Sequence, residues 1–152
     1  MLKKDDTFFM QEALKLAERA LEEGEIPVGC VIVAEDKIIG KGYNQTERLN
    51  DSTAHAEMIA ITSAFQHMGG KYLRNCKMYV TLEPCPMCAG AANWAQLAEL
   101  IYGAEDPGKG FDSFTSEKGK NLLHPSTKIK RGILKEPSKK FLDVFFARVR
   151  SK

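Results

Sequence analysis

Two short motifs constrain this chain more than any other feature of its sequence. His55-Ala56-Glu57 places an imidazole two residues before a carboxylate, and Cys85 and Cys88 follow later, three residues apart. Zinc prefers nitrogen and sulfur ligands, and a hydrolytic zinc site uses three protein ligands so that water can occupy the fourth position. His55, Cys85 and Cys88 therefore predict a catalytic zinc site, and the fold must bring the two motifs together.

Glu57 is the candidate catalytic residue of this site. It lies next to the predicted metal without being needed as a ligand, which is what a proton carrier for zinc-activated water requires. A closed structural zinc site has no use for such a carboxylate. The motif therefore favours an enzyme over a binding module.

Two other interpretations of the thiols stay open at this point. The spacing of Cys85 and Cys88 also fits a redox pair, although that interpretation leaves His55 and Glu57 without a role. A closed structural site would need a fourth ligand, for which Cys30 or Cys76 is available.

The remaining ligand-type residues are expected to be structural. Cys30 lies in the apolar run at residues 27–33, where a free cysteine behaves as a small buried hydrophobe, and Cys76 precedes another apolar strand. His67 is near the end of a predicted helix, where histidine interacts with the last carbonyl groups.

The length of 152 residues predicts a single domain over residues 1–152. The four cysteines do not suggest a disulfide framework, because two have metal-ligand spacing and two lie in apolar strands. We therefore expect a reducing, cytoplasmic location. The first residues lack the apolar stretch of a signal peptide, and no run is long enough to span a bilayer, so no membrane association is expected.

Charge is distributed unevenly along the chain. Residues 109–152 contain 12 Lys and Arg against 4 Asp and Glu, whereas residues 1–108 contain 10 against 16. A basic C-terminal third is typical of a surface that binds a polyanion such as a nucleic acid, although scattered lysines can also simply be solvated.

Hydrophobic periodicity and turn residues predict alternating helices and strands. Helices are expected at residues 6–23, 55–68, 86–97 and from 137 onward, and strands at 28–34, 38–43, 77–82, 100–102 and 128–134. Asp51, Ser52 or Thr53 is expected to cap the helix that carries His55 and Glu57 in its first turn. The last helix is expected to turn four apolar residues inward, namely Phe141, Leu142, Phe145 and Val149.

This order predicts an α/β fold, a three-layer α/β/α sandwich around a mixed five-stranded sheet with one antiparallel hairpin and parallel crossovers. In such folds the ligand crevice lies beyond the strand ends, where loops and helix starts gather. Both zinc motifs fall at predicted helix starts.

The chain resembles the tRNA-specific adenosine deaminases, which convert the wobble adenosine of an anticodon to inosine, within the cytidine deaminase-like superfamily. Its two metal motifs match the H-x-E and P-C-x-x-C signature of zinc-dependent nucleobase deaminases. Longer strings narrow the resemblance to the tRNA family: Glu25-Ile26-Pro27-Val28-Gly29, Gly42-Tyr43-Asn44, Thr53-Ala54-His55-Ala56-Glu57 and Thr81-Leu82-Glu83-Pro84-Cys85-Pro86-Met87-Cys88-Ala89-Gly90-Ala91.

The resemblance implies roles for particular residues. It implies that His55, Cys85 and Cys88 bind Zn²⁺ and that Glu57 shuttles protons. It further implies that the substrate is bound by Asn44, which would hydrogen-bond a flipped base, by Asp106, which would contact a flanking ribose hydroxyl, and by Phe146. The implied partners are a tRNA anticodon loop and a second copy of the chain, with residues 91–95 near the homodimer interface.

Substrate identity stays open between two enzyme classes. Loop 106–114 departs from the usual tRNA-family segment and is similar to that of guanine deaminases, which share the zinc site, whereas Leu123-His124-Pro125 is similar to the tRNA enzymes. The alternative is therefore a guanine or cytosine deaminase acting on a free base or nucleoside. A nonenzymatic zinc-stabilised RNA-binding domain is a third possibility. Tyr102, Phe111 and Phe114 could stack on bases, but aromatics at such positions are usually part of the core.

Overall fold

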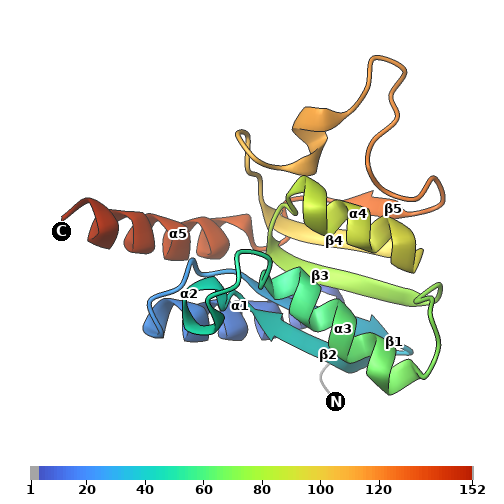
Figure 1. Cartoon of the computed structure of the whole chain (residues 1–152), viewed down its shortest axis with the longest axis horizontal. Coiled ribbons are helices and arrows are strands. Elements are labelled where there is room, and N and C mark those ends of the chain that lie inside the picture. The colour runs from blue at the N-terminus through green and yellow to red at the C-terminus, as the bar shows by residue number, and fades with distance from the viewer. Residues whose placement is uncertain (1–3, 152) are drawn as a thin grey trace.

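A five-stranded sheet organises the chain in the order β2-β1-β3-β4-β5 (Figure 1). The computed structural model describes residues 4–151. Its strands are β1 (Gly29–Ala34), β2 (Lys37–Tyr43), β3 (Cys76–Leu82), β4 (Glu99–Ala104) and β5 (Lys128–Lys130). Its helices are α1 (Asp6–Glu22), α2 (Thr46–Leu49), α3 (Ala56–Met68), α4 (Pro86–Ala95), the 3₁₀ turn η1 (Phe111–Phe114) and α5 (Lys135–Arg150).

The sheet mixes both strand orientations, as the sequence predicts. Strand β1 pairs antiparallel with β2 and with β3, whereas β3 with β4 and β4 with β5 are parallel. The β1–β2 hairpin closes on Glu35 and Asp36, whose φ angles are 50° and 61°. Two successive positive φ angles give the turn type whose twist matches that of the flanking strands.

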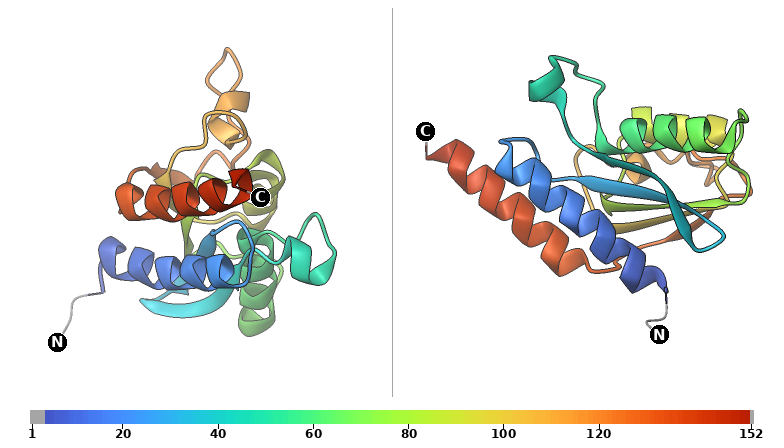
Figure 2. Two further views of the ribbon diagram at one scale, coloured as in Figure 1. Left: turned by 90° about the vertical axis from the view of Figure 1, so that its left-hand side faces the viewer. Right: turned by 90° about the horizontal axis from the view of Figure 1, so that it is seen from below.

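Helices cover both faces of the sheet (Figure 2). Helices α1 and α5 lie side by side on one face, and α3 and α4 lie on the other. Side chains alternate along β1 accordingly, since Val31 and Val33 pack with Phe9 of α1 while Cys30 and Ile32 belong to the core under α3 and α4. The predicted three-layer α/β/α sandwich is confirmed.

Helix α3 lies unusually close to strand β2 because two strand residues have no side chain. A Cβ atom at Gly40 would overlap the carbonyl oxygen of Ala60, and one at Gly42 would overlap that of Ala56. Glycine permits this backbone-to-backbone approach. Because α3 begins at Ala56, the contact at Gly42 sets how far the start of α3 stands above the sheet.

Some element boundaries differ from the prediction. Strand β5 ends at Lys130 rather than at residue 134, because Gly132 and Leu134 have left-handed φ angles of 81° and 55° and leave the extended conformation. Helix α4 ends at Ala95, because Gln96 is left-handed with a φ of 58°. The sequence predicts loops where the structure has the short helix α2 and the 3₁₀ turn η1.

Helix α5 is only partly buried, contrary to the prediction that its apolar residues all pack inward. It begins at Lys135, so that Pro137 falls in the first turn, where its missing N–H is not needed. Phe141, Leu142 and Phe145 are half-buried, but Val149 is 52% exposed. The reason is that α5 continues past the end of the sheet, so its last turns have little beneath them (Figure 1).

Candidate metal centre and active-site pocket

The three predicted ligands meet between the first turns of two helices. His55 is the N-cap of α3, Cys85 is the N-cap of α4, and Cys88 follows in the first turn of α4. The Nδ1 atom of His55 lies 3.6 Å from the Sγ atom of Cys85 and 3.6 Å from that of Cys88. Tetrahedral zinc with ordinary Zn–N and Zn–S bonds separates nitrogen and sulfur ligands by about 3.6 Å. The donor set therefore fits zinc in both chemistry and spacing.

The other ligand-type residues lie outside this group. Within residues 4–151, the cluster of side chains that could hold a metal here consists of His55, Cys85 and Cys88. Cys30 and Cys76 are fully buried in the core, and His67 is exposed at the end of α3. Three ligands leave one coordination position for water, which is the arrangement of a catalytic site rather than a closed structural one.

The two thiols differ in acidity because one is hydrogen-bonded to the other. The hydrogen bond from the Cys88 thiol lowers the pKa of Cys85 to about 5, and the backbone N–H groups of Met87 and Cys88 at the start of α4 add to this. The same bond to Cys85, together with burial, raises the pKa of Cys88. Zinc binds thiolates, so both cysteines would be deprotonated when they hold the metal.

Glu57 faces the same pocket from the first turn of α3 and is only 4% exposed. Burial raises the pKa of Glu57 from its ordinary value to about 7, because a charged carboxylate loses its hydration. A carboxyl group with a pKa near neutrality can both accept and donate a proton at physiological pH.

A cavity of about 180 Å³ opens in front of these residues. Two loops form its sides, loop 44–51 after β2 and loop 105–112 after β4. Its lining contains the candidate catalytic and ligand residues together with residues from both loops and from neighbouring strands: Ile26, Val28, Asn44, Thr46, His55, Glu57, Leu82, Glu83, Cys85, Asp106 and Lys109.

Asn44 caps the helix that carries the metal ligand. Its Oδ1 atom accepts a hydrogen bond from the N–H of Ala56 at 2.8 Å. The predicted caps are wrong, because the Asp51 carboxylate instead accepts bonds from the N–H and hydroxyl of Thr53. Since the oxygen of Asn44 is engaged, the group that it can offer to a bound molecule is its amide NH₂.

The structure brings two of the three predicted substrate residues to the pocket. Asn44 and Asp106 line it, but Phe146 does not. Phe146 is 42% exposed on α5 and lines a neighbouring cavity with Pro107 and Leu142. Among the other aromatic residues, Tyr102 and Phe111 are fully buried, whereas Phe114 is 54% exposed.

Two buried carboxylates that sequence reasoning missed hold the loops of the pocket. Glu25 accepts hydrogen bonds from the N–H groups of Glu47 and Arg48 at 3.0 and 2.8 Å. Glu83 accepts bonds from the N–H groups of Asp106 and Asp112, both at 3.0 Å. One sequence signal could have identified these two buried carboxylates. Each glutamate comes directly before an apolar or proline-containing segment, as in Glu25-Ile26-Pro27 and Glu83-Pro84.

Comparison with known proteins agrees with the zinc-deaminase motifs found in the sequence. Residues 3–104 match the family model of the cytidine and deoxycytidylate deaminase zinc-binding region. The chain is 40% identical over 150 residues to a tRNA-specific adenosine deaminase of Streptococcus pyogenes, covering 98% of this chain and 88% of that protein.

Each of the two candidate enzyme classes is represented by a similar solved structure. A tRNA:A34 deaminase, studied for A-to-I editing at the wobble position, is 37% identical with a TM-score of 0.81, covering 90% of this chain and 99% of that one. Guanine deaminase from Bacillus subtilis is 38% identical with a TM-score of 0.63, covering 74% of this chain and 75% of that one. Within residues 4–151, none of the helices is both long and apolar enough to cross a membrane.

Proposed function

Because the chain belongs to the tRNA-specific adenosine deaminase family, we propose that it hydrolyses the wobble adenosine of a tRNA anticodon to inosine and ammonia. One observation carries this proposal beyond family membership. A buried carboxylate, Glu57, stands beside a three-ligand zinc set and faces a cavity lined by polar loop residues.

His55, Cys85 and Cys88 would hold the zinc ion. When bound, zinc would lower the pKa of its water from that of bulk water to about 7. Glu57 takes a proton from the attacking water and delivers it to the ring nitrogen beside C6 of adenine. Glu57 then carries the proton of the new C6 hydroxyl to the amine, so that the C6–N bond breaks, the C6 carbonyl of inosine forms and ammonia is released. One carboxylate can serve both transfers because Glu57 lines the cavity together with the candidate ligands His55 and Cys85.

The loops supply the contacts to the substrate. Asn44 would donate its amide N–H to the base, and Asp106 would accept a bond from the 2′-hydroxyl of a flanking ribose. Phe146 lines the neighbouring cavity together with Pro107, where it would contact a nucleotide beside the reacting one. A base inside a duplex cannot reach the metal, so the substrate must be splayed from a single-stranded loop.

The experiment that tests the proposal compares substrates directly. Purified zinc-loaded protein is incubated separately with an adenosine-bearing anticodon stem-loop RNA, guanine and cytosine, and inosine and ammonia are measured. Inosine formation in the RNA supports the proposal. Rapid turnover of guanine, together with no inosine in the RNA at low salt, would overturn it in favour of the guanine deaminase that the 38% identical Bacillus subtilis structure represents.

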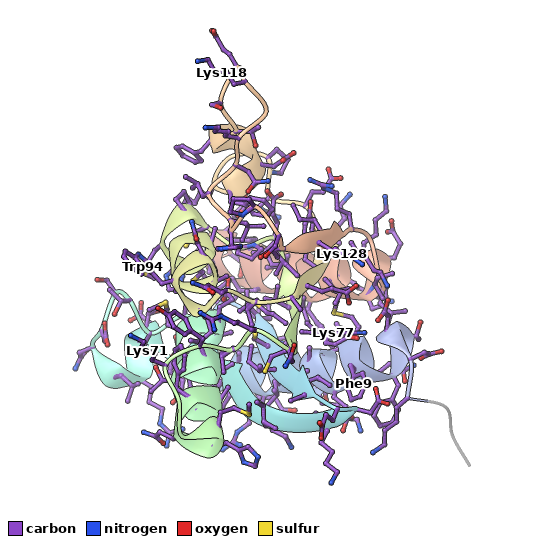
Figure 3. The ribbon with its side chains drawn as sticks, turned by 90° about the vertical axis from the view of Figure 1, so that its right-hand side faces the viewer. Phe9, Lys71, Lys77, Trp94, Lys118 and Lys128 are labelled. Atoms are coloured by element: carbon purple, nitrogen blue, oxygen red, sulfur yellow. The ribbon has the colours of Figure 1, made fainter. Side chains whose placement is uncertain are left out.

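We further infer a homodimer that meets at α4. The outer face of this helix presents an apolar and small-residue stripe at helical spacing, comprising Met87, Gly90, Ala91 and Trp94. Trp94 is 83% exposed and points away from the rest of the chain (Figure 3). An exposed tryptophan within an apolar stripe is typical of a protein interface.

The dimer is tested with a single substitution. Trp94→Glu is expected to convert the dimer to a monomer in light scattering coupled to size-exclusion chromatography, because it places a charge in the interface. Val149→Glu, at another exposed apolar position, on α5, is the control and should leave the mass unchanged. A monomeric wild-type protein would contradict the inference.

The single domain over residues 1–152 and the cytoplasmic location stay predictions. One sheet and two hydrophobic clusters account for the described elements, which supports the prediction of a single domain. All four cysteines are free, which is compatible with a reducing compartment.

A further inference from the structure

Glu83 is a buried charged residue at the pocket with no part in the proton transfers or the ligand set. It is 5% exposed and lies at the end of β3, two residues before Cys85. Buried carboxylates are rare unless hydrogen-bonded or paired, because desolvation of a charge is costly. The partners of Glu83 should therefore show what it does.

Both partners of the Glu83 carboxylate are backbone N–H groups of one loop. Its Oε1 atom accepts from Asp106 and its Oε2 atom from Asp112, each at 3.0 Å. These two residues lie at opposite ends of loop 106–112. The carboxylate therefore ties together the two ends of the loop that forms one side of the pocket.

The loop is shaped around this carboxylate. A Cβ atom at Gly110 would overlap the carboxylate carbon and oxygens of Glu83, so a larger residue there would force the loop and this carboxylate apart. Nothing lies within 4 Å of where a Cβ would be at Gly108, two residues earlier. The requirement for glycine is therefore confined to the position that contacts Glu83.

The same loop carries the residue that would distinguish RNA from DNA. The side chain of Asp106 lines the pocket, while its own N–H is held by Glu83. The Oδ1 atom of Asp106 accepts a bond from the N–H of Lys109 at 3.1 Å, which fixes the carboxylate relative to the loop. Glu83 thus determines where the Asp106 carboxylate stands.

We propose that Glu83 is a positioning residue that sets substrate recognition by holding loop 106–112, and with it Asp106, against the flanking ribose of the RNA. This inference rests on the proposed function. Glu83 acts through the backbone of the loop and neither touches the reacting atoms nor binds the metal.

The test uses two substitutions that disturb the same contact from opposite sides. Glu83→Gln keeps the shape but replaces one acceptor oxygen with an NH₂ group that faces a backbone N–H. Gly110→Ala keeps the carboxylate but pushes the loop away from it. Each is expected to raise KM for the stem-loop RNA by about 10- to 100-fold, as loss of hydrogen bonds to a charged group would, with a much smaller change in kcat.

Matched controls separate positioning from a general effect on folding. Gly108→Ala makes the same change in the same loop where space is open, and Glu99→Gln makes the same change at a largely buried carboxylate paired with Lys77. Both should retain wild-type KM. All variants should contain as much zinc as the wild type. In both test variants, the ratio of kcat/KM for the RNA stem-loop over the matching DNA should be smaller than in the wild type.

The outcomes distinguish this proposal from the function on which it rests. Wild-type protein that makes no inosine from RNA would overturn both. An active wild type with unchanged KM in Glu83→Gln and Gly110→Ala would overturn only the positioning role. Loss of zinc in Glu83→Gln would also overturn it, because Glu83 would then be acting through Cys85.

Discussion

The floor of the pocket, formed by His55, Glu57 and Cys85 with the buried Cys88 beside them, lies on the first turns of α3 and α4. Its walls are the connecting segments 44–51, which includes the short helix α2, and 105–112. The positions of the floor residues follow from helix geometry and packing on the sheet. The wall positions depend on a few bonds from the buried carboxylates of Glu25 and Glu83 to loop N–H groups.

The floor residues therefore carry the reaction, whereas the wall segments determine which substrate is bound. A change in the floor should remove zinc or proton transfer and stop the reaction. A change in a wall should leave the reaction intact and alter which molecule is bound and how tightly. The following experiments test that separation, from the largest expected effect to the smallest.

Removal of a metal ligand should have the largest effect. Cys88→Ala is expected to lose zinc and activity, with a Tm about 5 °C lower or more, the shift for a loss of about 2 kcal/mol in a chain of this size. Elemental analysis and thermal unfolding measure both quantities. Cys76→Ala removes another fully buried thiol outside the metal group and should keep its zinc. A full complement of zinc in Cys88→Ala would show that the ligand assignment is wrong.

Removal of the proton carrier should stop turnover without releasing the metal. Glu57→Ala is expected to lower kcat by about 10²- to 10⁴-fold, the usual contribution of general acid–base catalysis. Zinc content should stay at the wild-type level, because no ligand is changed. The rate of inosine formation at saturating RNA measures kcat. Substantial residual deamination would exclude Glu57 as the proton carrier.

A change in the wall should affect substrate preference instead. Asp106→Asn is expected to narrow the ratio of kcat/KM for RNA over the matching DNA loop by about 10-fold, because an amide is a weaker acceptor for the 2′-hydroxyl than a carboxylate. Parallel assays of both stem-loops measure the ratio. An unchanged ratio would mean that Asp106 does not read the ribose.

The smallest effect is expected from single charges on α5. The log of the RNA affinity should fall with the log of salt concentration with a slope of about −0.7 per phosphate contacted on a single strand. Lys140→Gln should reduce the magnitude of this slope by about 0.7 if that lysine contacts a phosphate. Lys71→Gln, in the loop after the far end of α3, should not. A wild-type slope near zero would argue for an uncharged free base as the substrate.

The floor was predictable from the sequence because its residues form a spaced motif and each falls at a helix start. The order of elements also predicted the mixed sheet and three layers correctly. Helix starts were placed to within two residues, whereas the end of β5 was missed because the left-handed conformation of Leu134 has no sequence signal of its own.

The walls could not be predicted in the same way. Asn44 and Asp106 were identified through resemblance, and the cap that Asn44 provides to α3 joins segments that lie 12 residues apart. Glu83 and Asp112 are 29 residues apart. Such contacts depend on the folded path of the chain, and so does the exposure of Val149, which follows from where the sheet ends beneath α5.

The absence of a side chain at Gly42 has a consequence for how the sequence tolerates change. Any larger residue there would push the start of α3 away from the sheet, and His55 would move with it while Cys85 and Cys88 stayed on α4. A systematic substitution scan would therefore find Gly42 as intolerant as the residues that handle protons and metal. Mutational sensitivity alone would assign it to the reaction, although it has no functional group to contribute.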